Sequence, residues 1–151
     1  MTYRKSAALL LVFLGCVFFL RNSRLLPTNF ILLEAAASGN TKRVGRALAL
    51  GANVNGRASK WNRYESPLHN AALAGHVDTV EMLLPKGADI NANTDEGSTP
   101  LSYAVLGGNE GVVALLLQNG ADQDAMSIHG ATPLILAARD GHKAQTGNPS
   151  D

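Results

Sequence analysis

The side chains that could carry out chemistry are four histidines, one cysteine and twelve carboxylates. Histidine is the usual acid–base catalyst near neutral pH and a common metal ligand. His69, His76 and His142 follow a repeated pattern in the chain and converge on no common site, so we expect them to be structural. His129 lies outside that pattern and has no potential partner nearby in the sequence. The histidines therefore predict no metal site and no acid–base site.

The sequence lacks the common motifs that bind phosphate or metal, or that carry a catalytic nucleophile. It has no glycine-rich phosphate loop, His-Glu-x-x-His, Cys-x-x-Cys or Gly-x-Ser-x-Gly. Asp122 and Asp124 lack the pattern of a calcium loop, and Cys16 lies in an apolar run where nothing activates its thiol. We expect no catalytic residue, no cofactor, no metal and no small-molecule substrate, and hence no enzyme.

Proline and glycine recur every 33 residues along the chain. This period indicates the structural elements on which the histidines and carboxylates lie. A fixed period of this length is typical of stacked repeats, which offer an extended surface and no enclosed reaction chamber. The interval separates the members of three sets: Pro67, Pro100 and Pro133; Gly75, Gly108 and Gly141; and Gly87 and Gly120. The default function of such a chain is to bind another protein.

Each period encodes two short helices. Ser or Thr before each proline supplies an N-cap followed by proline at the first helical position, and the helix then ends at glycine. A second apolar helix follows, for example over residues 112–118. Helices of about eight or nine residues are unstable alone in water, so each pair must pack on the next. Small residues are expected where the pairs approach most closely: Ala71, Ala72, Ala104, Ala137 and Ala138.

The residues around these positions resemble the ankyrin-repeat family. Residues 66–76 (Ser-Pro-Leu-His-Asn-Ala-Ala-Leu-Ala-Gly-His) are similar to the family signature Thr-Pro-Leu-His-x-Ala-Ala-x-x-Gly-His. Similar segments occupy residues 80–91, 99–108, 112–122 and 132–142. The resemblance covers roughly residues 31–142. It implies an all-α ankyrin-repeat solenoid of about three complete helix pairs plus a truncated fourth. The apolar run at residues 7–20 predicts an apolar N-terminal helix before this solenoid.

The first and last units depart from the pattern. Residues 32–39 and 44–55 fit a first unit, but Phe30 and Ile31 stand where a Thr-Pro entrance is expected. The last unit has a first helix near residues 134–138, followed by a stretch without apolar periodicity that we expect to be disordered. Either another molecule covers this apolar edge, or the chain is a shortened member of a longer family. The expected organisation is an N-terminal segment (1–27), a repeat domain (28–142) and a tail (143–151).

The apolar run at residues 7–20 indicates export or membrane attachment. It is uncharged, with Arg4 and Lys5 before it and Arg21 and Arg24 after it. Its length suits a signal peptide better than a spanning helix, but an uncleaved single-pass anchor or a core or interface helix is also possible. We therefore expect the domain to be membrane-anchored, or secreted or periplasmic, rather than cytoplasmic.

Charge is strongly divided along the chain. Residues 1–66 hold ten Lys and Arg against two Glu, a net of +8, and residues 67–151 hold three against ten Asp and Glu, a net of −7. The basic half adjoins the apolar run, so it would be attracted to anionic head groups if the domain is tethered. The alternative is that the early units merely happen to be basic.

The loop at residues 56–65 is three residues longer than its equivalents. It holds Trp61, Tyr64 and three cations, and aromatic and Arg side chains dominate binding hot spots. Trp61 either contacts a partner or covers an end of the helix stack. Tyr64 replaces the glycine of the later units, Gly97 and Gly130, so we expect this turn to differ. Three cations on one loop are weak evidence for nucleic-acid binding, so we expect no nucleic-acid partner.

The resemblance also implies where a protein partner would bind. Ankyrin proteins use their loop tips and the exposed end of each first helix, and the face here grades from basic to acidic to apolar. We expect a non-catalytic adaptor; the alternatives are a structural subunit docked through the uncapped C-terminal edge, or an accessory protein guarding a membrane or periplasmic enzyme. The candidate contact residues are Lys60, Trp61, Asn62, Arg63, Tyr64, Glu65, Leu73, Asn93, Asp95, Glu96, Ser98, Leu106, Met126, Ile128, His129, Arg139 and Asp140.

Overall fold

The computed structural model describes residues 26–57, 64–126 and 130–139. All elements of regular structure in these residues are helices. In chain order they are α2 (Leu26–Ala37), α3 (Thr41–Ala49), α4 (Pro67–Ala74), α5 (Val77–Leu83) with the 3₁₀ turn η1 (Leu84–Lys86), α6 (Pro100–Leu106), α7 (Glu110–Gln118) and α8 (Pro133–Arg139).

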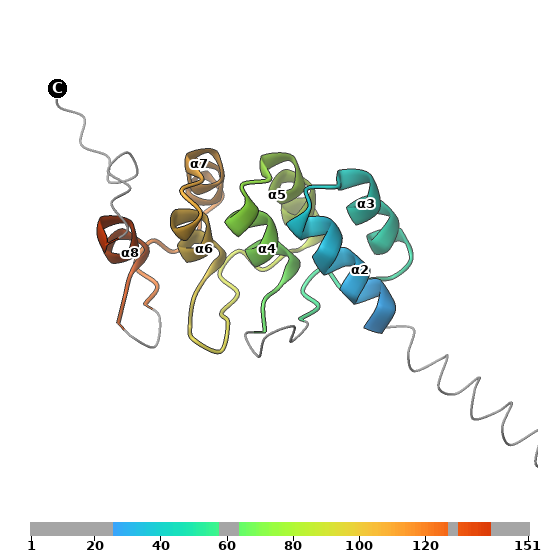
Figure 1. Ribbon diagram of the computed structural model, residues 1–151, viewed down its shortest axis with the longest axis horizontal. Helices are drawn as coiled ribbons and strands as arrows, with labels where there is room; N and C mark the ends of the chain where they lie inside the picture. The colour runs from blue at the N-terminus through green and yellow to red at the C-terminus, as the bar shows by residue number, and fades with distance from the viewer. Residues whose placement is uncertain (1–25, 58–63, 127–129, 140–151) are drawn as a thin grey trace, which may run out of the picture.

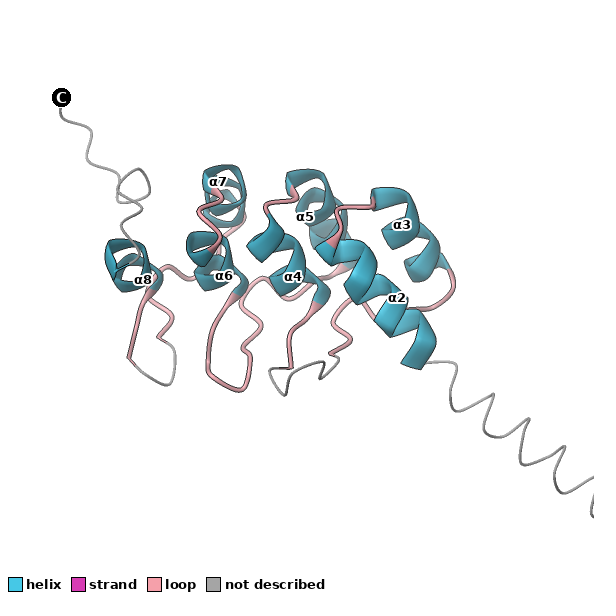
Figure 2. Cartoon of the chain, viewed as in Figure 1, coloured by secondary structure: helices cyan, strands magenta, loops and turns pink. Residues whose placement is uncertain are grey.

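The helices form two layers along one axis. The first helices of the units (α2, α4, α6 and α8) lie side by side in one layer, and the second helices (α3, α5 and α7) lie in the other (Figure 1). Long loops between units project from the layer of first helices (Figure 2). This arrangement confirms the predicted all-α solenoid for the described residues.

Helix starts and ends follow the predicted caps. The Thr99 hydroxyl accepts a hydrogen bond from the Ser102 N–H (3.3 Å), and Thr132 accepts one from the Ile135 N–H (3.3 Å). Gly75 ends α4 with φ +77°, a left-handed conformation that is far easier for glycine than for other residues. The Ser/Thr-Pro and glycine positions therefore set the boundaries of α4 and α6, and Thr132-Pro133 sets the start of α8.

One continuous apolar core joins the units, extending from Leu32 in α2 to Ala121 after α7. Ala71, Ala72 and Ala104 are fully buried between first helices, as predicted from their size. Ala138 is exposed, contrary to that expectation, because the only described helix that packs extensively on α8 is α6, on its other side. The side chain of Ala137 lies outside the described residues.

The first unit begins earlier than the sequence pattern predicts. Helix α2 starts at Leu26, and α3 starts at Thr41, where Asn40 caps it by accepting from the Arg43 N–H (3.0 Å). The extra turn of α2 carries Asn29, whose side-chain oxygen accepts from the Asn53 N–H (2.8 Å). A longer helix thus takes the place of the missing Thr-Pro entrance.

The predictions for the two ends of the chain fall outside the described residues. These are the apolar helix or signal segment at residues 7–20 and the disordered tail at residues 143–151. Among the residues that the structure does describe, no helix is both long and apolar enough to span a bilayer.

Leu116→Asp should unfold the stack, because Leu116 is completely buried in the core and an unpaired carboxylate there has no compensating partner. We expect a loss of about 4 kcal/mol or more in the free energy of unfolding, measured by urea denaturation followed by circular dichroism. The neighbouring Leu117, which is 42% exposed, provides the control: Leu117→Asp should change stability little. Equal stability of the two variants would contradict the core assignment.

Candidate protein-binding face

A ladder of side-chain hydrogen bonds holds the inter-unit loops in register. The Asn55 side chain accepts from the Asp89 N–H (2.8 Å) and donates to the Gly87 carbonyl (2.9 Å) of the next unit. Asn91 repeats the first contact, accepting from the Asp122 N–H (2.9 Å). Asn29 of α2 makes the equivalent bond at the start of the stack. Because the Asn55 and Asn91 rungs satisfy backbone groups of the next unit, the loops they join cannot shift independently.

A second set of bonds crosses between units at the turns after the first helices. His76 Nε2 lies 3.1 Å from the Ala37 carbonyl, which confirms its structural role. Asn109, at the equivalent position one period later, donates to the Ala72 and Leu73 carbonyls (both 2.8 Å). Sequence reasoning missed Asn109, although its place 33 residues after His76 was a usable signal.

His69 connects a first helix to two loops. Its Nδ1 accepts from the Ser66 N–H (3.2 Å), so the proton lies on Nε2, which donates to the Ser98 carbonyl (3.1 Å) of the next loop. The ring also meets Tyr103 edge-on, with centroids 5.0 Å apart. Burial lowers the pKa of His69 from 6.5 to about 4, against the opposing effect of its bond to Ser98. The predicted structural role is confirmed, and the neutral ring suits it.

The backbone at Tyr64 resembles that of the later units, although we expected this turn to differ. Tyr64 has φ +48°, in the same left-handed region as Gly97 (φ +72°) and Gly130 (φ +69°). The backbone at Tyr64 therefore does not differ from the later units in the way that we expected. A bulky residue in this region carries a cost of about 1–2 kcal/mol. Next to it, Glu65 accepts from the Tyr103 hydroxyl (2.9 Å) of the following unit. That bond helps to hold the turn, while the Tyr64 side chain is 47% exposed.

The remaining candidate residues divide by their exposure. Leu73 on α4 is 45% exposed and Met126 is 67% exposed. In the loop before α6, three more candidates are exposed: Asn93, Asp95 and Glu96. These side chains are therefore available to a partner.

Two candidates are partly used by the fold. Ser98 is half-buried, and its N–H donates to the Thr94 hydroxyl (3.2 Å) while its carbonyl accepts from His69. Leu106 packs against the small cluster of Val105 and Leu136. The other candidates lie outside the described residues: Lys60, Trp61, Asn62, Arg63, Ile128, His129, Asp140 and the side chain of Arg139.

The part of the stack that carries this face is acidic. Residues 64–126 hold nine Asp and Glu against Lys86 as their one Lys or Arg. Within the described ranges, no group of three His, Cys, Asp or Glu side chains is placed to hold a metal ion. The arrangement presents carboxylates and apolar side chains on a scaffold whose loops are fixed by hydrogen bonds.

Comparison with known proteins identifies the repeat. A family model for ankyrin repeats in three copies matches residues 7–94, 32–127 and 91–145. Two curated relatives are each 40% identical over 68 residues, or 45% of this chain: the 2-5A-dependent ribonuclease of Mus musculus and the probable E3 ubiquitin-protein ligase XBOS33 of Oryza sativa subsp. japonica. The alignments span 9% and 13% of those two proteins, so they compare one short region.

The depressed pKa of His69 makes stability dependent on pH. The folded protein holds His69 neutral, with a pKa of about 4 against an ordinary value of 6.5. The unfolded chain therefore takes up a proton at His69 first as the pH falls. The contribution of His69 to the free energy of unfolding is complete above pH 6.5 and is lost as the pH falls towards 4. We expect the free energy of unfolding to fall by about 2 kcal/mol between about pH 7 and about pH 5, in urea titrations. His69→Gln should remove this part of the slope. An identical slope in the two proteins would exclude His69 as its source.

Proposed function

The chain belongs to the ankyrin-repeat family, whose repeats are protein–protein interaction modules, and we propose that it binds its partner through one defined face. This binding face consists of Tyr64, Leu73, Asp95, Glu96 and Met126. The observation that carries the proposal is that all five are exposed on first helices or inter-unit loops, although their backbones are positioned by the stack.

Pre-organisation supports this choice of face. The loop that holds Asp95 and Glu96 is closed by the Thr94 N–H to Ser98 carbonyl bond (3.0 Å) and anchored by His69. A loop that is already ordered loses less conformational entropy on binding. Exposed Tyr64 and Leu73 can serve as apolar anchors, and the carboxylates as the polar rim that sets orientation.

The enzyme names of the two relatives give no reason to propose catalysis by this chain. One relative is named a ribonuclease and the other a probable ubiquitin-protein ligase, and the aligned region is a small part of each. We therefore propose a non-catalytic adaptor. We further propose that residues 7–20 act as a signal or anchor segment that places the domain at or across a membrane, supported by their uncharged apolar composition.

One observation favours a second role, as a structural subunit. Leu134 and Ile135 on α8 are 60% and 52% exposed at the C-terminal edge of the described stack. Adjacent exposed aliphatic side chains of this size are suited to packing against another helix. In this role, α8 would dock onto a second protein.

The binding face can be tested with two variants that make matched chemical changes. Leu73→Arg with Glu96→Lys alters the face, and Leu117→Arg with Glu81→Lys makes the same substitutions at exposed positions on the second helices. Crosslinked pull-downs from the native host should recover a partner with the wild type and with the second-helix variant. The face variant should lose that partner while its circular dichroism spectrum stays unchanged.

The opposite result has a clear meaning. If the face variant retains the partner and the second-helix variant loses it, the first-helix and loop face is not the contact surface. If both retain it and Ile135→Arg loses it, the edge at α8 is the contact surface.

A further inference from the structure

The N-terminal edge of the stack combines cations with exposed apolar side chains. We use this name for the surface formed by Phe30 and Ile31 of α2 and by Lys42, Arg43, Arg46 and Leu50 of α3 and its C-cap. Leu50, Phe30 and Ile31 are 66%, 48% and 37% exposed. Helices α2 and α3 form one end of the described solenoid (Figure 1).

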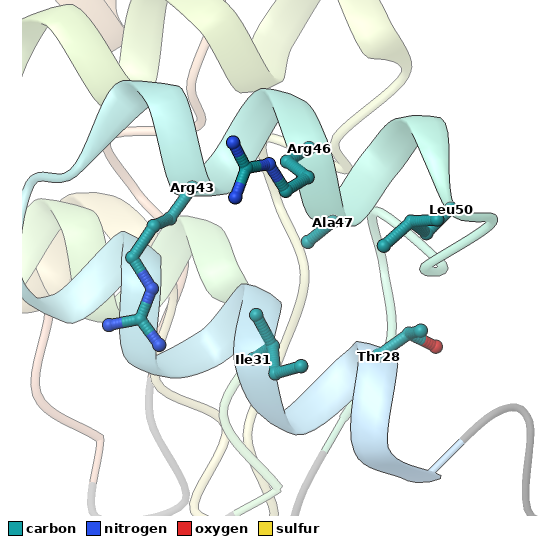
Figure 3. Close-up of a pocket in the computed structure, with 6 residues that line it drawn as sticks. All are labelled: Thr28, Ile31, Arg43, Arg46, Ala47 and Leu50. Carbon is teal, nitrogen blue, oxygen red and sulfur yellow. The ribbon is translucent and has the colours of Figure 1, made fainter.

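The edge contains a hollow that is lined by both apolar and cationic side chains. Its volume is about 210 Å³, and Ile31, Ala47 and Leu50 contribute apolar surface to it. Arg43 and Arg46 extend from α3 beside the same space, opposite Ile31 and Thr28 of α2 (Figure 3). An amphiphile with an anionic group would find both kinds of contact here.

Three of these residues form a stripe along α3. Lys42, Arg46 and Leu50 are spaced four residues apart, which places them on the same side of the helix. All three are exposed. The stripe therefore offers two cations followed by a large apolar side chain.

Charge distinguishes this edge from the rest of the stack. Residues 26–57 hold four Lys and Arg, and their one carboxylate, Glu34, lies 3.4 Å from Arg43 in an exposed ion pair. Residues 64–126 hold nine carboxylates and Lys86. The described stack is thus positive at one end and negative beyond it, so an anionic surface would attract the N-terminal edge and repel the later units.

We propose that the N-terminal edge docks on an anionic lipid surface. Lys42, Arg43 and Arg46 meet the head groups, and Leu50, Ile31 and Phe30 enter the boundary between head groups and acyl chains. The adjoining segment supports this occupant, because residues 1–25 carry four more Lys and Arg around the apolar run at residues 7–20. Docking in this way brings the positive end of the stack, and not its acidic later units, to the anionic surface.

A fluorescent label that responds to polarity can test the docking in the full chain. Cys16→Ser removes the native thiol, and Leu50→Cys or Gln118→Cys then places the label on the edge or on α7. Vesicles containing phosphatidylserine should raise the emission of the label at position 50 severalfold more than vesicles of pure phosphatidylcholine. The label at position 118 should respond little to either type of vesicle. Attachment through residues 1–25 alone would not produce this difference between positions 50 and 118.

Two charge reversals of equal size identify the surface. Arg46→Glu should abolish most of the phosphatidylserine response at position 50, whereas Lys86→Glu, at an exposed position outside the edge, should leave it unchanged. Equal responses to the two vesicle types, or at the two label positions, would overturn the proposal. So would an emission change at position 50 that grows with protein concentration without vesicles, which would identify a second copy of the chain as the occupant.

Discussion

The structure depends on one constraint, which is that none of its helix pairs can bury its own apolar surface. The helices of the units after the first are seven to nine residues long, too short to be stable alone in water. Each pair gains a core only by packing on its neighbours, which is why Leu32, Leu68, Leu101 and Leu116 belong to one continuous cluster. Stability is therefore shared between units, and the bonds that cross between them contribute to it along with those within helices.

Much of the fold could be predicted from the sequence because its boundaries are local. Ser or Thr before proline defines the starts of α4, α6 and α8, and glycine after the apolar run defines the ends of α4 and α6, without reference to the rest of the chain. The early start of α2 could not be predicted in this way, since it depends on Asn29 meeting the backbone of Asn53, 24 residues later. Asn109 also bonds to carbonyls of the preceding unit, but its place one period after His76 made it predictable.

The candidate binding face could be predicted only in outline. The family pattern indicated loop tips and first helices, but exposure and bonding decide which side chains are available. Glu65 is held by Tyr103, and Leu106 is packed in a small cluster, whereas Leu73 and Met126 are open to solvent. The left-handed backbone of Tyr64 was not predicted because residue type alone argued against it. The division of charge, by contrast, was visible in the sequence and makes one end of the stack positive and the rest negative.

Amide hydrogen exchange in an Asn109→Ala variant tests whether each unit is held by its neighbour. Asn109 belongs to the turn between α6 and α7 but bonds to carbonyls at the end of α4. We expect faster exchange at the end of α4 and its turn, in the preceding unit. Asn119→Ala is the control, because Asn119 bonds to Leu115 within its own unit, and its effect should stay local. Faster exchange confined to the α6–α7 unit in Asn109→Ala would contradict the claim.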